Sequence, residues 1–211
     1  MFSRMFDRAG PLWRAAESIG DMIVVNLLFL LTLVPVVTAG AGLTALYDTA
    51  RRLLDDEDQG PARTFWMSFR VNFRPSTALW AIAGPLGLAL VLSWVFMRID
   101  ELLVLKVILT WVYLLVFPFL WTMQARFENT VARTLRNAVV VAVARLPYAL
   151  GVLVIQAVVI AVIVLTWVML PQIVIILLLL GYALAVFAAT PLLQKAIAVL
   201  MPDDSASAGL R

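Results

Sequence analysis

The chain contains neither cysteine nor histidine, and only 14% of its 211 residues are charged. Without cysteine and histidine it cannot form a thiolate nucleophile, a Ser-His-Asp triad, a Cys/His zinc site or a histidine-ligated haem. A metal site built from carboxylates alone stays possible in principle. We therefore expect a protein that is not an enzyme, with no cofactor, no metal and no catalytic residue.

Apolar residues are abundant: 64% of the chain is hydrophobic, and the mean hydropathy is +1.00. Average globular domains are about 45–50% apolar, so a soluble protein of this size could not bury this composition, whereas a bilayer would solvate it. The apolar runs are continuous and do not alternate with polar residues, which excludes an outer-membrane barrel. The predicted class is an all-α integral membrane protein.

Five apolar runs are long enough to cross the hydrocarbon core at 1.5 Å of rise per residue. We expect them to form one membrane domain over residues 1–200, interrupted by polar helical insertions at 38–75 and 124–145. Residues 201–211 are predicted to be a disordered tail. The predicted spans are residues 19–37, 76–97, 102–123, 147–170 and 172–198.

The cations are unevenly divided between the two sides that five spans would define. The side with both insertions and the C-terminus carries eleven: Arg51, Arg52, Arg63, Arg70, Arg74, Arg126, Arg133, Arg136, Arg145, Lys195 and Arg211. The other side carries four: Arg4, Arg8, Arg14 and Arg98. This excess indicates membrane topology, not nucleic-acid binding. It predicts a bacterial inner-membrane protein with cytoplasmic insertions and an external N-terminus. Alternatively, the first run is re-entrant and turns back at Pro35, which would place the N-terminal arginines in the cytoplasm.

The first apolar run ends in the decamer LVPVVTAGAG, residues 33–42. Pro35 removes a backbone N–H and kinks the exit, and Thr38 can bond the freed carbonyls. Gly40 and Gly42 can let the chain reverse direction at the headgroups. We therefore predict a structural elbow that lays the amphipathic segment 43–54 along the membrane surface.

The segment 63–74 has an aromatic stripe, because Phe65, Phe69 and Phe73 recur at every fourth position. Arg70 and Arg74 lie elsewhere on the helix, a pattern typical of a helix in the headgroup region that contacts anionic lipid. The alternative is that this helix docks onto a cytoplasmic partner. The second insertion repeats the pattern, with Arg133 on a face opposite Phe127 and with Glu128 as its one carboxylate.

Neutral polar residues within the runs, such as Asn26, Thr110, Gln156 and Thr166, are expected to bond neighbouring helices. Lys106 is shallow enough to reach the interface. Prolines recur in the runs, and broken helices can form transport sites, so a small homo-oligomeric transporter or channel remains an alternative.

Three stretches together resemble the YesL-like family of bacterial membrane proteins, a family of unassigned function. They are PVVTAGAGLTALY (35–47), FWMSFRVNFRPS (65–76) and RFENTVARTLRNA (126–138). Single positions that match the family pattern are Asn26, Pro35, Thr38, Gly40, Asn72, Phe73, Arg126, Phe127 and Asn129.

The resemblance implies an accessory role in carbohydrate uptake of the ABC type, with permease or ATPase subunits as partners. It implies no catalytic residue. Besides the transporter alternative, a membrane-organising or sensing protein that acts through its basic cytoplasmic face stays open.

Overall fold

The computed structural model describes residues 11–97, 99–170, 172 and 174–198, and all of its regular elements are helical. The predicted all-α fold is therefore confirmed. The predicted disordered tail lies outside the described residues. The α-helices are α1 (Pro11–Leu33), α2 (Ala39–Leu54), α3 (Pro61–Phe96), α4 (Leu103–Arg126), α5 (Val131–Ala144), α6 (Leu146–Met169) and α7 (Val174–Ile197), and the 3₁₀ turns are η2 (Val36–Thr38) and η3 (Asp100–Leu102).

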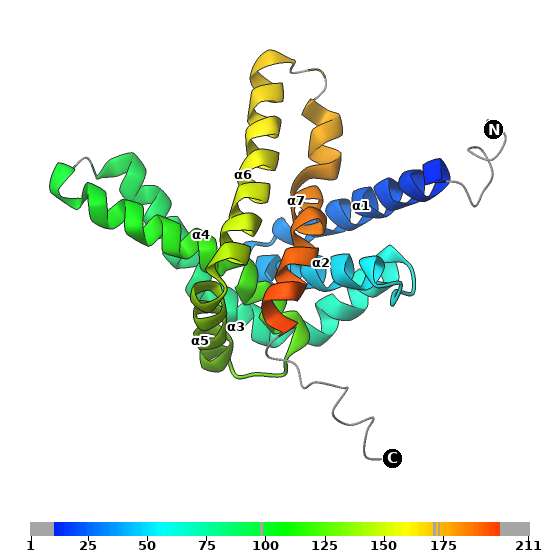
Figure 1. The fold of residues 1–211 in the computed structure, drawn as a ribbon, viewed down its shortest axis with the longest axis horizontal. Coiled ribbons are helices and arrows are strands. Elements are labelled where there is room, and N and C mark those ends of the chain that lie inside the picture. The colour runs from blue at the N-terminus through cyan, green and yellow to red at the C-terminus, as the bar shows by residue number, and fades with distance from the viewer. Residues whose placement is uncertain (1–10, 98, 171, 173, 199–211) are drawn as a thin grey trace.

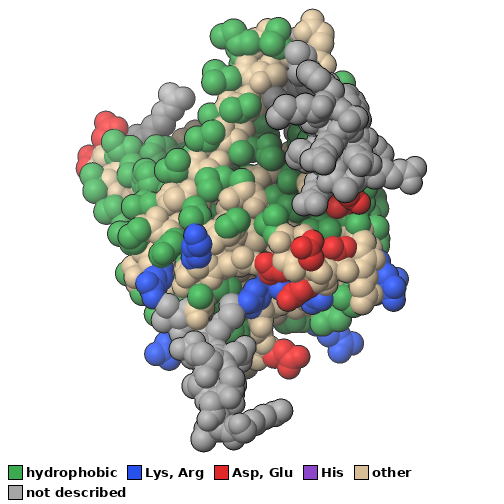
Figure 2. Space-filling model, turned by 45° about the vertical axis from the view of Figure 1, so that its right-hand side comes forward, with side chains coloured by type: hydrophobic (Ala, Val, Ile, Leu, Met, Phe, Trp, Pro, Cys, Tyr) green, Lys and Arg blue, Asp and Glu red, His purple; other side chains and the backbone are tan. Residues whose placement is uncertain are grey.

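The helices radiate in pairs from a common centre (Figure 1). α6 rises beside α7, the later half of α3 forms a second arm with α4, and α1 and α2 run side by side toward a third direction. Charged side chains gather in a band across the lower part of the face in Figure 2, while the parts above are almost entirely hydrophobic except for acidic side chains at one tip. We refer to the end of the molecule with this band as the charged end.

Four helical segments among the described residues are long and apolar enough to cross a membrane. They correspond to the last four predicted spans, although the first begins much earlier than residue 76 because α3 continues back to Pro61. The predicted span 19–37 is not among the four, and its helix α1 ends at Leu33. The segments are Pro61–Phe96, Asp100–Arg126, Leu146–Met169 and Leu179–Ile197.

Helix α2 lies at the centre of the molecule. All twelve residues from Ala39 to Ala50 are buried, because α1, α3, α4 and α7 all pack against this helix. The prediction that segment 43–54 lies along the membrane surface is therefore wrong for most of its length. Its apolar positions do recur with helical spacing, but neighbours cover its polar positions as well.

The turn before α2 differs from the predicted elbow in which residues make it. The helix α1 stops before Pro35, and the Thr38 hydroxyl donates to the carbonyls of Thr32 and Pro35, the latter at 2.7 Å. Gly40 and Gly42 do not reverse the chain, since both lie inside α2 with helical neighbours. They are close-contact positions: a Cβ on Gly40 would lie 2.6 Å from Trp80 Cβ, and one on Gly42 would collide with the Thr32 hydroxyl.

The segment 63–74 is not a separate interfacial helix, since it forms the first half of the 36-residue helix α3. Pro75 lies inside this helix and does not end it. One side of this half faces the core, where Phe65 is fully buried and Ser68 is nearly so. The opposite side is exposed. The aromatic stripe is thus largely a packing surface against the rest of the protein.

Candidate functional site

An open groove runs along the charged end between the first half of α3, the end of α4 and the α4–α5 loop. We call it the α2–α4 groove, because Asp48 and Arg52 of α2 also line it. Its volume is about 720 Å³. The lining residues are Asp48, Arg52, Met67, Ser68, Val71, Asn72, Pro75, Gln124, Ala125, Arg126, Phe127, Glu128, Asn129 and Thr130.

The groove brings together parts of two of the three stretches that carry the family resemblance, together with α2 residues that follow the first stretch. Asn72 belongs to the second stretch and the run 126–129 to the third. Asp48 follows directly on Tyr47, the last residue of the first stretch. Segments that are far apart in sequence therefore meet at one surface, which makes this groove the candidate site.

An ion-pair network centred on the buried Asp48 forms one wall of the groove. The Asp48 side chain is only 3% exposed, and it accepts hydrogen bonds from Arg52 Nε at 3.0 and 3.1 Å and from Arg51 Nη2 at 3.4 Å. Because these pairs are spaced three and four residues apart on one helix, α2 itself positions them. A carboxylate this deeply buried requires such partners, since an unpaired charge in the interior is strongly destabilising.

The network continues into the α2–α3 loop. Arg51 Nη1 donates to Glu57 Oε2 at 2.6 Å and to Asp55 Oδ2 at 3.4 Å, and Gln194 Nε2 of α7 donates to the same Asp55 oxygen at 2.9 Å. Burial alone would lower the pKa of Arg51, but the hydrogen bond to Glu57 and the charge of Asp48 outweigh it and raise that pKa. The hydrogen bond from Arg51 lowers the pKa of Glu57, and the positive charge of Arg51 adds to this effect.

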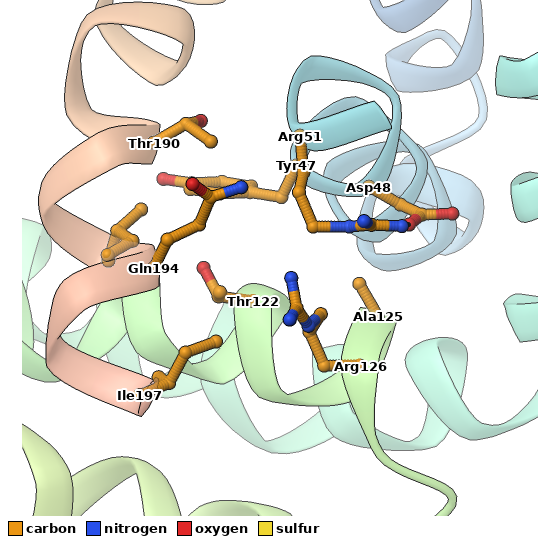
Figure 3. Close-up of a pocket in the computed structure, with 10 residues that line it drawn as sticks. Tyr47, Asp48, Arg51, Thr122, Ala125, Arg126, Thr190, Gln194 and Ile197 are labelled. Carbon is orange, nitrogen blue, oxygen red and sulfur yellow. The ribbon is translucent and has the colours of Figure 1, made fainter. Parts of the chain in front are cut away.

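A small cavity lies on the other side of this network, between α2, α4 and α7 (Figure 3). Arg51 and Arg126 approach it from α2 and α4, while Gln194 reaches toward it from α7. Its volume of about 10 Å³ is near the lower limit for one water molecule, so it is too small for a solute. The cavity therefore belongs to the packing around the network, and the larger groove offers the binding surface.

The groove presents charges of both signs together with amides. Arg52 and Arg126 supply cations, and Asp48 and Glu128 supply carboxylates. Two amides are held in place: Asn72 Nδ2 donates to the Ser68 carbonyl at 3.0 Å, and Gln124 Oε1 accepts from the Thr134 hydroxyl at 3.5 Å. Such a surface can recognise a partner by directional hydrogen bonds and charge complementarity.

The other predicted site residues are scattered around the groove. The side chains of Phe65 and Phe69 stack against each other at 6.5 Å between ring centroids, inside or beside the core, and Phe73 is partly exposed. Arg70 and Arg74 lie on the outer face of α3, and Arg133 is exposed on α5. None of these six residues lines the groove.

Sequence reasoning did not single out Asp48, Arg52 or Gln124, which line the groove. A signal for the first two was present, because an aspartate with arginines three and four positions later favours pairing on a helix. No comparable signal marked Gln124, because its role depends on where α5 packs.

A second polar cluster lies in the apolar interior. The hydroxyls of Tyr47 and Tyr182 lie 2.9 Å apart, and Gln156 Nε2 donates to both at 3.2 Å. This joins α2, α6 and α7 and confirms that Gln156 bonds neighbouring helices. Thr110 likewise accepts from Trp94 Nε1 at 3.0 Å. Tyr182 was not predicted to take part, because nothing local distinguishes it from a packing tyrosine.

Helix α7 is broken next to this cluster. Gly181 has φ +42° and ψ −138°, which is not helical. The break frees backbone N–H groups of the following turn, and Asn26 Oδ1 of α1 accepts from the N–H of Ala183 at 3.3 Å. A Cβ on Gly181 would lie 2.8 Å from the Asn26 amide atoms, so glycine is required for both backbone angle and space. Asn26 thus caps a helix other than its own.

Lys106 is buried, and its predicted reach to the membrane interface stays a prediction. Its ammonium donates to the carbonyls of Ser93 at 3.1 Å and of Met97, and it lies 5.9 Å from the ring centroid of Trp94. The Ser93 carbonyl also accepts from the Met97 N–H at 3.1 Å, and Met97 is the residue that follows α3. The lysine therefore caps the α3–α4 arm at its tip and is far in sequence and space from the groove.

Four candidate spans and a charged end define a multi-pass membrane protein. Residues 22–94 match the family model described as "Protein of unknown function, DUF624", and this match confirms the YesL-like resemblance. The matched segment includes the first two of the three resembling stretches, whereas the third, 126–138, lies outside it. No curated protein and no solved structure matches the chain.

Proposed function

We propose that the chain is a non-enzymatic membrane protein that binds a protein partner in the α2–α4 groove, as an accessory component of ABC-type carbohydrate uptake. The observation that carries the binding role is the convergence of Asp48, Asn72 and the run 126–129 on one open groove. The carbohydrate role and the importer subunits as partners rest on the family resemblance.

The groove suits a protein segment because it is open along its length and mixes charge with apolar surface. Asp48 and Arg52 are already paired with each other, so a partner need not bear the full cost of neutralising a buried charge. Exposed Met67 and Val71 supply apolar contact area beside them. Apolar contact provides affinity, and the charged rim selects the partner.

The test is site-specific photo-cross-linking in native membranes that express an importer. A photoreactive amino acid replaces Val71 in the groove in one variant and Val104, near the tip of the α3–α4 arm, in a matched control. Both positions are strongly exposed, at 74% and 68%. We expect importer permease or ATPase subunits to cross-link from position 71 and not from 104. Equal yields from both positions, or no importer subunit from 71, would overturn the proposal.

A second candidate is a homo-oligomeric transporter, which the broken helix α7 favours. The break at Gly181 lies beside Asn26, Tyr47, Gln156 and Tyr182, and discontinuous helices with polar groups in the membrane can form transport sites. This function predicts solute flux in proteoliposomes that contain only this protein. It also predicts that Gln156→Leu abolishes the flux. Absence of flux for sugars and common ions would exclude it.

The relation between α1 and α2 leads to a further proposal on topology. The two helices form a hairpin: Gly42 lies against Thr32 and Phe29 near the turn, and at the other end Asp21 lies close enough to Asp58 for their charges to interact. The start of α1 and the α2–α3 loop therefore lie at the same end. This favours the re-entrant alternative, with the N-terminus on the cytoplasmic side.

Single-cysteine labelling can test this topology cleanly, because the chain has no native cysteine. We expect Ser18→Cys and Asp56→Cys to react with an impermeant maleimide from the cytoplasmic side in inverted vesicles. Glu101→Cys, at the tip of the α3–α4 arm, should react only from outside. Labelling of Ser18→Cys together with Glu101→Cys would contradict the hairpin topology and support a spanning α1.

A further inference from the structure

The outer face of α3 combines a basic half with an apolar half. At about 100° per residue, Arg63, Arg70, Thr77, Ala81 and Leu88 fall on one side of the helix. The buried residues of α3, such as Phe65, Leu79 and Ala83, fall on the opposite side. One continuous stripe therefore runs from the charged end into the apolar arm.

An apolar groove occupies the second half of this stripe. It has a volume of about 510 Å³ and lies between the turn η2 and α3. Val36 and Val37 form one wall, and Trp80, Gly84 and Leu88 form the floor and the other wall. A Cβ on Gly84 would lie 2.9 Å from the Trp80 ring, so the glycine keeps space for the ring and for the groove.

Exposed arginines lie immediately before this groove on the same stripe. Arg70 and Arg74 line a shallow hollow together with Phe69 and Phe73. None of the ion pairs among the described residues involves Arg70 or Arg74, in contrast to the paired Arg51 and Arg52 on α2. Two unneutralised cations at the end of an apolar groove complement a ligand with an anionic head and a hydrocarbon tail.

The dimensions agree with one membrane leaflet. Thr77 and Leu88 are eleven residues apart, which corresponds to about 16 Å along the helix axis. One leaflet contributes about 15 Å of the hydrocarbon core. Arg74 precedes Thr77 by one helical turn, at the depth where the phosphates of that leaflet would lie.

We propose that this face of α3 binds an anionic phospholipid, with its phosphate at Arg70 and Arg74 and an acyl chain in the groove beneath Val36 and Val37. The proposal does not rest on the importer role. Val71 and Pro75 line both surfaces, but Arg70, Arg74 and the residues of the apolar groove do not line the α2–α4 groove. A second copy of this chain is the competing occupant, and the experiment below distinguishes it from a lipid.

The experiment is lipid titration of the full-length protein in detergent, followed by native mass spectrometry, with phosphatidylglycerol and phosphatidylcholine as probes. We expect wild type to retain phosphatidylglycerol preferentially. The variant Arg70→Gln/Arg74→Gln should bind it about thirtyfold more weakly, because each arginine near an anionic surface contributes about fivefold. The matched control Arg133→Gln/Arg136→Gln removes two exposed arginines from α5 and should leave binding unchanged.

A second pair of variants tests the acyl groove. Ala81→Phe fills the groove and should weaken binding of both lipids, whereas Ala89→Phe places the same side chain on another exposed face of α3 and should not. Three results would overturn the proposal: equal retention of the two lipids by wild type, equal effects of the two arginine pairs, or equal effects of the two phenylalanines. A wild-type dimer that Ala81→Phe dissociates would assign the groove to a second copy and also overturn it.

Discussion

Helices α2 and α5 come from the two predicted polar insertions, but they differ greatly in how much of their surface is buried. Both have one apolar and one polar side by sequence, yet α2 is buried over twelve consecutive residues. In contrast, α5 buries only Thr134, Ala138, Val141 and Ala142 and keeps Arg133 and Arg136 exposed. Amphipathic pattern alone therefore does not tell which helix lies on the surface.

The difference follows from side-chain size. Helix α2 begins Ala-Gly-Ala-Gly, and this end approaches α3 closely enough that any Cβ on Gly40 would meet the Ser76 carbonyl. Small residues let helix backbones approach within a membrane, where packing and hydrogen bonds hold helices together. Because the two helices lie this close, the Thr44 and Ser76 hydroxyls form a hydrogen bond at 2.8 Å. Helix α5 carries valine, leucine and arginine instead.

The largest effect is expected when Gly40, a close-contact residue of α2, is replaced by a larger residue. In Gly40→Leu the new side chain has to displace the α3 backbone at Ser76, which is not the flexible end of a side chain. We expect a loss of about 3 kcal/mol or more, or failure to fold. Thermal unfolding in detergent, followed by circular dichroism, measures this loss.

The matched control enlarges an exposed small residue on the other helix. Ala132→Leu on α5 should change stability by no more than about 0.5 kcal/mol. If both substitutions have similar effects, close packing of α2 is not what distinguishes the two helices.

The next largest effect is expected at the charges of the two helices. Asp48→Asn removes the carboxylate that Arg51 and Arg52 share, and it should destabilise the protein by about 2 kcal/mol because the hydrogen bonds from both arginines to a charged group are weakened. Glu128→Gln, in the exposed loop before α5, should be nearly neutral. Chemical unfolding of both variants in detergent checks the prediction, and an equal loss in both would contradict it.

The sequence predicted what depends on local pattern. It predicted the four apolar segments that are long and apolar enough to cross a membrane, and it predicted that Gln156 bonds neighbouring helices. Both follow from local pattern, because a long apolar run in a bilayer must be helical and a polar side chain within it must find a hydrogen-bond partner. It did not predict that α2 is central or that α3 continues through Pro75, because both depend on which neighbours pack against the helix. The α2–α4 groove was only partly predictable for the same reason. Asn72 and Arg126 carried a motif, whereas Gln124 became a groove residue through the position of α5.

The smallest expected effect is a pH dependence of stability at the C-terminal end of α2, where Arg51 forms an ion pair with Glu57. The folded protein lowers the pKa of Glu57 below its usual value of 4.5, so the folded state binds fewer protons than the unfolded state in that range. The stability that this pair contributes is therefore complete above about pH 4.5 and is lost as the pH falls through the folded pKa. We expect the melting temperature of wild type to exceed that of Glu57→Gln at pH 7, with a gap that closes in acid and also narrows at high salt, since Glu57 is exposed. Glu128→Gln should show no such gap. A gap that widens toward acid would mean that Arg51 does not stabilise the ionised form of Glu57.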